Sequence, residues 1–174
     1  MTGFAEWVRQ GPWPTDGAMG SLLEERGYQL SRMLWSSTML IEDPDAIAQV
    51  HRDYVAAGGR VLTSASYQTS RQGFAAEGRD VADADRQMLA AVQLARGAAA
   101  TAPEHVWVAA SIGPYGAVLG GGQEYVGDYG LAHRDLVALS LSMCHRCWVT
   151  SARKFHSLST PMPGACGTGR TACG

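Results

Sequence analysis

Four cysteines and a histidine near the carboxyl terminus are residue types that bind metal ions. They are Cys144, His145, Cys147, Cys166 and Cys173. Zinc sites commonly use cysteine pairs that are two to four residues apart, and the first pair here has that spacing. The second pair is separated by six residues, which is wide for such a site. A zinc site is therefore one hypothesis for this segment.

The stretch GACGTGRT at 164–171 shares its glycine spacing with a phosphate-binding loop. Arginine replaces the usual lysine, however, and no strand pattern precedes the stretch. A phosphate loop needs a strand before it and a helix whose amino terminus faces the phosphates. We therefore exclude phosphate binding by this segment.

The composition of residues 139–174 favours a different hypothesis. All 16 acidic residues lie at or before Asp135, where only 10 basic residues accompany them, whereas four basic residues and no acid follow. The periods of 3.6 and 2 residues that mark helices and strands are also lost after Leu139. We expect residues 1–138 to form one domain and 139–174 to be an out-of-frame or disordered tail, with the zinc site as the alternative.

Acidic and aromatic residues also occur in loops that are rich in glycine or serine. SIGPYGAVLGGGQEYVGDYG at 111–130 carries two acids and three tyrosines, and it follows an apolar run. TDGAMGS at 15–21 and SASYQTS at 64–70 are two further loops of this kind. Such side chains bind ligands in some proteins and stabilise turns in others, and the pattern alone leaves both interpretations open.

Helices and strands alternate between these loops. The apolar stripe of PDAIAQVHRDYVAA predicts a helix over 44–57, with Asp43 as its N-cap and Pro44 at its first position. A second helix is predicted over 82–100, and a third is expected to begin near Ala132 with Leu136 and Val137 inside. We expect Trp35, Tyr54 and Met88 in the core, and His51 to be a helix-surface or packing residue without a catalytic role.

Strands are predicted at 61–66 and 105–111, with a weaker one in VRQGPWPT at 8–15, whose prolines disfavour a strand. Strands and helices in this order predict a parallel sheet with right-handed crossovers. The three loops then lie at the carboxyl ends of the strands, where parallel α/β proteins place their functional residues.

Three stretches in this order resemble the homocysteine S-methyltransferase family, in the branch that uses S-methylmethionine or S-adenosylmethionine. They are DGAMGSLLEERG at 16–27, LWSSTML with VHRDYVAAGGRVLTSASYQTS within 34–70, and the loop at 111–130. The resemblance covers roughly residues 15 to 138. It implies the α/β class and a (β/α)8 TIM barrel, of which about three βα units are recognisable, so a partial barrel is expected.

The resemblance implies transfer of a methyl group from a sulfonium donor to the thiol of homocysteine, which gives methionine. It also implies a zinc ion, because a thiol bound to zinc is deprotonated and so becomes a nucleophile. The family's zinc-binding cysteines come later than the matched region, and we expect these ligands to be absent from this chain. The alternative is a truncated, inactive remnant of such an enzyme.

Five site residues are carried over from the resemblance as substrate-binding, and the catalytic residue is left unassigned. Asp16 matches a carboxylate near the amino group of homocysteine, and Gly17 a glycine that lets the backbone approach the ligand. Tyr67 matches an aromatic group beside the donor, where its ring attracts a cation. Glu124 and Tyr125 match the mouth of the pocket. LGGGQEY departs from the usual family text, so the sequence does not specify the donor.

The remaining expectations follow from composition. A net charge of −2 gives no reason to expect nucleic acid or an anionic membrane as a partner. The start of the chain has no signal-peptide pattern, and no run approaches the roughly 18 apolar residues that span a bilayer. We expect a cytoplasmic protein that acts on small molecules, of unknown oligomeric state, with reduced solubility where a partial barrel exposes apolar surface.

Overall fold

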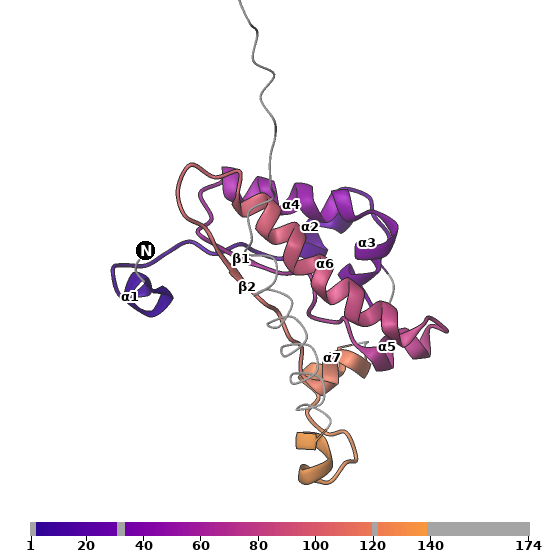
Figure 1. Ribbon diagram of the computed structural model, residues 1–174. Helices are drawn as coiled ribbons and strands as arrows, with labels where there is room; N and C mark the ends of the chain where they lie inside the picture. The colour runs from indigo at the N-terminus through magenta and orange to yellow at the C-terminus, as the bar shows by residue number, and fades with distance from the viewer. Residues whose placement is uncertain (1–2, 31–33, 120–121, 139–174) are drawn as a thin grey trace, which may run out of the picture.

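A computed structural model describes residues 3–30, 34–119 and 122–138 (Figure 1). The predicted cysteine site and the predicted tail at 139–174 lie outside these residues. The helices are α1 Phe4–Val8, α2 Met19–Glu25, α3 Ser36–Glu42, α4 Pro44–Ala56, α5 Arg71–Ala76, α6 Val81–Ala99 and α7 Tyr115–Leu119. The strands are β1 Val61–Thr63 and β2 Trp107–Ala109, and η1 Gln123–Tyr125 is a 3-10 turn. Residues 133–138 are also helical.

The two strands pair in parallel, which confirms the predicted α/β class and strand direction. The register pairs Val61 with Trp107, Leu62 with Val108 and Thr63 with Ala109. The predicted first strand is reduced to a single parallel bridge between Thr15 and Val61, because its prolines donate no ladder hydrogen bond. The extended segments therefore lie in chain order, although two strands do not by themselves form a barrel.

The cap of α4 agrees with the sequence prediction, and α6 begins with a cap of the same kind. The Asp43 side chain accepts a hydrogen bond from Ala46 N at 3.1 Å, and Asp80 accepts one from Ala82 N at 2.9 Å. β1, in contrast, is shorter than the predicted strand over 61–66. Ser66 N donates back to Ser64 O at 2.8 Å, so the chain turns after Thr63 and the following residues form a loop.

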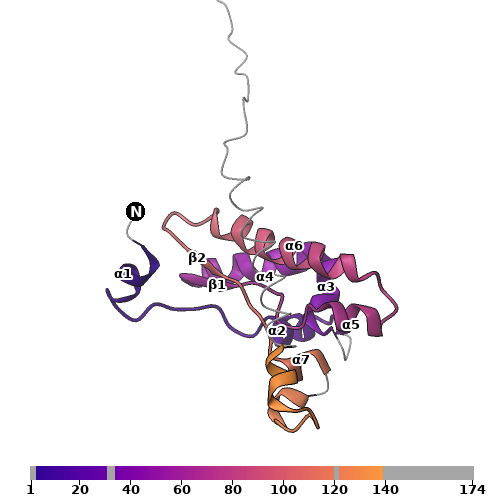
Figure 2. The same cartoon turned by 60° about the horizontal axis from the view of Figure 1, so that its bottom comes forward.

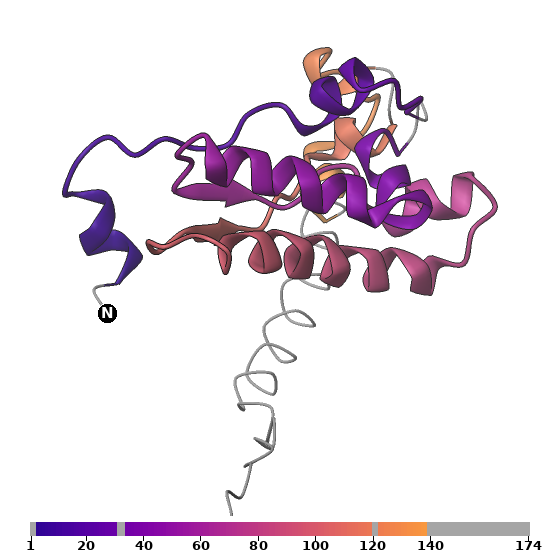
Figure 3. The ribbon, with the colours of Figure 1, turned by 90° about the horizontal axis from the view of Figure 1, so that it is seen from above.

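Helices α4 and α6 lie side by side along the strands (Figure 3). The larger core cluster brings together α2, α3, α4 and α6 with the loop after β1: Leu23, Met39, Leu40, Ala46, Ile47, Val50, Ala65 and Ala91. A second cluster joins α6 to the strands through Leu62, Ala95, Ala98 and Val106, and half-buried Tyr54 packs against both clusters. Met88 is buried as predicted, whereas Trp35 is only half-buried.

The segment from α7 to residue 138 projects away from the α4–α6 layer (Figure 2). It contains α7 and η1, so the predicted loop at 111–130 includes two helical turns. Val137 is 41% exposed, and the prediction that it faces the interior is wrong, since no described element covers that face of the helix. Leu136 is half-buried.

At the other end of the strands, α1 packs Phe4 and Trp7 against Trp107, with ring centroids 5.1 and 5.9 Å apart. Among the residues that the structure describes, no helix has the length and apolar character that a membrane crossing requires.

Candidate functional site

The site begins at the carboxyl end of β1, where the Asp16 carboxylate is fixed on Thr63. Asp16 Oδ2 accepts a hydrogen bond from Thr63 N at 2.6 Å, and Oδ1 accepts one from Thr63 Oγ1 at 2.9 Å. Asp16 N donates to Val61 O at 2.9 Å, which continues the parallel bridge of Thr15. A single side chain therefore joins the ends of two neighbouring segments, with its carboxylate held in one orientation.

Two opposing effects act on the Asp16 carboxyl group. Burial raises its pKa above the usual value, and the hydrogen bonds from Thr63 lower it by a smaller amount. No arginine or lysine among the described residues forms an ion pair with Asp16. Each carboxylate oxygen has lone pairs to spare beyond its bond from Thr63, so the group can accept further bonds from a cationic ligand.

Gly17 lies against the side chain of Tyr54. A Cβ atom at this position would lie 2.8 Å from Tyr54 Oη, so a larger residue would require the tyrosine ring to shift. Gly17 itself is exposed, which keeps its backbone accessible beside Asp16. The sequence predicted the glycine for ligand access and did not foresee the role of Tyr54.

Trp35 is a site candidate that the sequence analysis assigned to the core. Its φ of +40° is the only positive value for a non-glycine residue in the described part of the chain. Such strained backbone is found most often at functional sites. The indole ring lies directly over Gly20, where a Cβ atom would come within 2.5 Å of it, and Nε1 donates to Glu24 Oε1 at 3.4 Å. Nothing in the sequence signals the positive φ.

A serine network fastens the loop after β1 to the loop after β2. The hydroxyls of Ser64 and Ser66 lie 2.8 Å apart; Ser111 N donates to Ser64 Oγ at 3.0 Å, and Ser66 Oγ donates to Ser111 O at 2.8 Å. Gly113 N donates to Tyr67 O at 3.0 Å. The sequence patterns did not predict this network, although the alternation of serine in SASYQTS is a usable signal.

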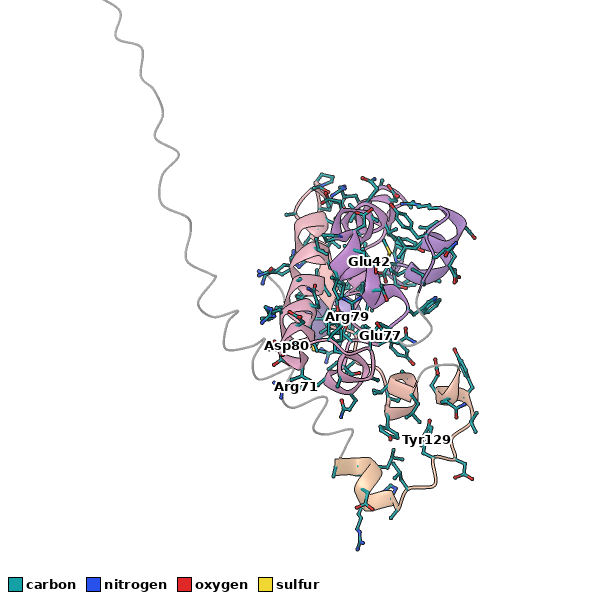
Figure 4. All side chains as sticks on the ribbon, turned by 90° about the vertical axis from the view of Figure 1, so that its right-hand side faces the viewer. Glu42, Arg71, Glu77, Arg79, Asp80 and Tyr129 are labelled. Carbon is teal, nitrogen blue, oxygen red and sulfur yellow. The ribbon has the colours of Figure 1, made fainter. Side chains whose placement is uncertain are left out.

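The network positions Tyr67 beside the third loop. Burial raises the pKa of the Tyr67 phenol, and the charge of Glu124 raises it further, so these two predicted site residues lie within electrostatic range of each other. Glu124 Oε2 is shielded from solvent, whereas Tyr125 is 88% exposed and is not enclosed by described residues. Figure 4 shows Tyr129 in the segment that projects from the α4–α6 layer, away from the ionic side chains labelled around Arg79.

A buried polar group lies behind the loop at 64–70. Thr69 Oγ1 donates to Ser37 Oγ at 2.8 Å, and both side chains are almost completely buried. Gln68 Oε1 and Thr38 Oγ1 have no hydrogen-bond partner among the described residues. The group connects the start of α3 to the loop that carries Tyr67, and no sequence pattern predicted it.

His51 is a packing residue, so the surface alternative is wrong. It is fully buried on α4, next to Val50, and neither ring nitrogen has a partner among the described residues. Burial lowers the pKa of the imidazole from 6.5 to about 4. The neutral ring therefore fills core volume at neutral pH.

Within residues 3–30, 34–119 and 122–138, no three side chains of histidine, cysteine, aspartate or glutamate come together in a way that could hold a metal ion. Cysteine is the ligand that the resemblance implies for zinc, and all four cysteines lie outside these ranges. The described residues therefore do not fit a zinc site.

Comparison with known proteins gives consistent matches. The profile of a family described as homocysteine S-methyltransferase matches residues 15–147. Homocysteine S-methyltransferase YbgG of Bacillus subtilis is 42% identical over 135 residues, which are 70% of this chain and 42% of that protein. Homocysteine S-methyltransferase of Escherichia coli is 46% identical over 120 residues, which are 66% of this chain and 39% of that protein. The chain thus spans about two fifths of the length of these relatives.

A solved structure also superposes on this chain. The metallated form of the Escherichia coli homocysteine methyltransferase MmuM matches with a TM-score of 0.66 and 40% sequence identity. The match covers 79% of this chain and 52% of that protein.

Proposed function

This chain belongs to the homocysteine S-methyltransferase family, and we propose that it forms the amino-terminal part of an enzyme that methylates the thiol of homocysteine. The donor in this proposal is a sulfonium compound, either S-methylmethionine or S-adenosylmethionine. The observation that carries the proposal is the Asp16 carboxylate, which Thr63 fixes at the end of β1 without an ion-pair partner among the described residues. Homocysteine brings an ammonium group that complements this carboxylate.

The residues of the chain bind and orient the two substrates. Asp16 holds the amino group of homocysteine, and the exposed backbone of Gly17 lies beside it. The Tyr67 ring lies against the sulfonium group of the donor, and Glu124 and Tyr125 form the mouth of the pocket. Their contribution to the rate is to align the thiol sulfur with the methyl carbon.

The methyl transfer is a single displacement at the methyl carbon, in which one bond forms and one bond breaks. The thiolate sulfur of homocysteine forms a bond to the methyl carbon, and the bond from that carbon to the donor sulfur breaks. The electron pair of that bond stays on the donor sulfur, which becomes a neutral thioether. The thiol proton leaves before the displacement, because the thiolate is the nucleophile.

A zinc ion bound in the whole enzyme would lower the pKa of a coordinated thiol, whose proton would pass to solvent. Since the described residues do not fit a zinc site, we propose that its ligands come from outside them. We also propose that β1 and β2 are consecutive strands of a (β/α)8 barrel. The superposition on 52% of the solved relative supports this arrangement. The division into 1–138 and 139–174 remains a prediction.

A methyl-transfer assay on the full chain tests the proposal. The protein is incubated with homocysteine and either donor carrying an isotopically labelled methyl group, with zinc present, and labelled methionine is measured by mass spectrometry. We expect homocysteine binding detectable by calorimetry, because Asp16 lies in this chain, and label in methionine where the zinc ligands of the whole enzyme are also supplied. Failure of both homocysteine binding and methyl transfer would refute the proposal. That result would favour the inactive remnant, which the identities of 42 and 46% to named methyltransferases do not favour.

A further inference from the structure

The carboxylate of Glu124 lies near tyrosine side chains and has no cation beside it among the described residues. Its Oε2 atom is shielded from solvent and has no hydrogen-bond partner there. None of the ion pairs in the described part of the chain includes Glu124. Burial raises the pKa of Tyr67, and Glu124, Tyr125 and Tyr129 raise it further through their charges, so all four groups share one electrostatic environment.

Close contacts fix the backbone of the segment that contains α7, η1 and Tyr129. A Cβ atom at Gly116 would come within 2.5 Å of Glu124 Cα and within 2.3 Å of Tyr129 Oη, so α7 lies directly against η1 and the segment that follows it. The rings of Tyr115 and Tyr129 meet edge to face, with centroids 5.5 Å apart. Glu124 is therefore carried on a packed scaffold and not on a loose loop.

A carboxylate oxygen that is shielded from water and has no hydrogen-bond partner is costly. The faces of tyrosine rings attract cations through their quadrupole. Both features favour a ligand that carries a positive charge. A sulfonium group suits this environment, because it has no proton to lose and so keeps its charge when water is removed.

We propose that Glu124 is the residue that selects a positively charged methyl donor over a neutral thioether. This inference rests on the proposed function, since the ligand that carries the charge is the donor of that reaction. The sulfonium loses its charge as the methyl group leaves, so the carboxylate stabilises the bound donor more than the transition state. Glu124 therefore acts on the affinity for the donor.

The test compares S-methylmethionine with methionine, its neutral counterpart, by calorimetry on the full chain. We expect Glu124→Gln to reduce the preference for S-methylmethionine about tenfold. Glu124→Asp keeps the charge and should keep most of the preference. Asp128→Asn is the matched control, because it removes a charge from the same loop while its side-chain oxygen can still accept the bond from Gly130 N at 3.2 Å.

A preference that is unchanged in folded Glu124→Gln overturns the inference, and so does an equal loss in Asp128→Asn. A further measurement needs no variant. The preference of the unaltered chain for S-methylmethionine is measured at low and high salt, and an electrostatic preference should weaken as salt is added. A preference that does not change with salt counts against the role of Glu124. Homocysteine binding is measured on the same samples. If the unaltered chain fails to bind homocysteine, the proposed function is at fault. If it binds homocysteine and the donor preference does not depend on Glu124, only this inference is lost.

Discussion

The buried imidazole of His51 makes the stability of this protein depend on pH. Its pKa is about 4 in the folded chain, against an ordinary value of 6.5 that applies to the unfolded chain. Above pH 6.5 neither state binds the proton, so the free energy of unfolding is at its full value. As pH falls from 6.5 to 4 only the unfolded chain is protonated, and stability is lost. Linkage gives a loss of about 2 kcal/mol at pH 5 and about 3 kcal/mol at pH 4.

The substitution His51→Leu isolates this effect. Leucine has a similar volume and no titratable group, so it fills the site and removes two ring nitrogens that have no described partner. We expect the variant to be more stable than the unaltered protein by about 1 to 3 kcal/mol at pH 7.5. The difference between the two should grow by a further ~2 kcal/mol at pH 5, because only the histidine form loses stability there.

Urea unfolding followed by circular dichroism at both pH values measures these differences. His133→Gln is the control, since it removes another imidazole from an exposed position. A parallel loss of stability in the unaltered protein and in His51→Leu would contradict the reasoning. It would mean that His51 finds a hydrogen-bond partner or a solvent path, or that other groups dominate the acid response.

Two further predictions concern the loops at the strand ends. Gly113→Ala should cost about 2 kcal/mol in urea unfolding, because the new Cβ atom would lie 2.3 Å from Tyr67 O, whereas Gly97→Ala, with no atom within 4 Å, should stabilise α6 by about 0.5 kcal/mol. Equal changes in the free energy of unfolding for Gly113→Ala and Gly97→Ala would refute the close approach of Gly113 to Tyr67 O. Asp16→Asn should weaken homocysteine binding about tenfold in calorimetry, since it removes the charge that the ammonium group meets, while Asp45→Asn on exposed α4 surface should not. Unaltered binding in Asp16→Asn would exclude the proposed role.

Local chemistry accounts for the elements that the sequence predicted well. Asp43 and Pro44 begin α4, and Asp80 begins α6, because a short acceptor side chain and a fixed φ favour a helix start wherever they occur. Gly58 ends α4 with a φ of +96°, which glycine adopts without a steric penalty. The apolar stripes of these helices then identified their buried faces.

The predictions that were wrong share one physical reason, which is that they depended on contacts between parts of the chain that are far apart in the sequence. The strand predicted over 61–66 ended early, because Ser66 N bonds back to Ser64 O and turns the chain after the last bond to the partner strand, from Ser64 N to Ala109 O. Val137 was expected inside because its pattern is apolar, but burial depends on what packs against the helix. The positive φ of Trp35 is set by its surroundings and leaves no mark in the residue types.

The amino-acid sequence, through its resemblance to the family, nominated the residues of the candidate site, and their roles in binding stay predictions. Asp16, Gly17, Tyr67 and Glu124 stand in loops that follow strands, and the order of those strands brings the loops to one end of the sheet. What each of them contacts depends instead on the folded chain. The bonds from Thr63 to Asp16 and the position of Glu124 near Tyr67 join residues more than 45 apart in the chain, and no local propensity encodes such contacts. They arise when α4 and α6 pack on the paired strands, because that arrangement brings the loops that follow the strands close together.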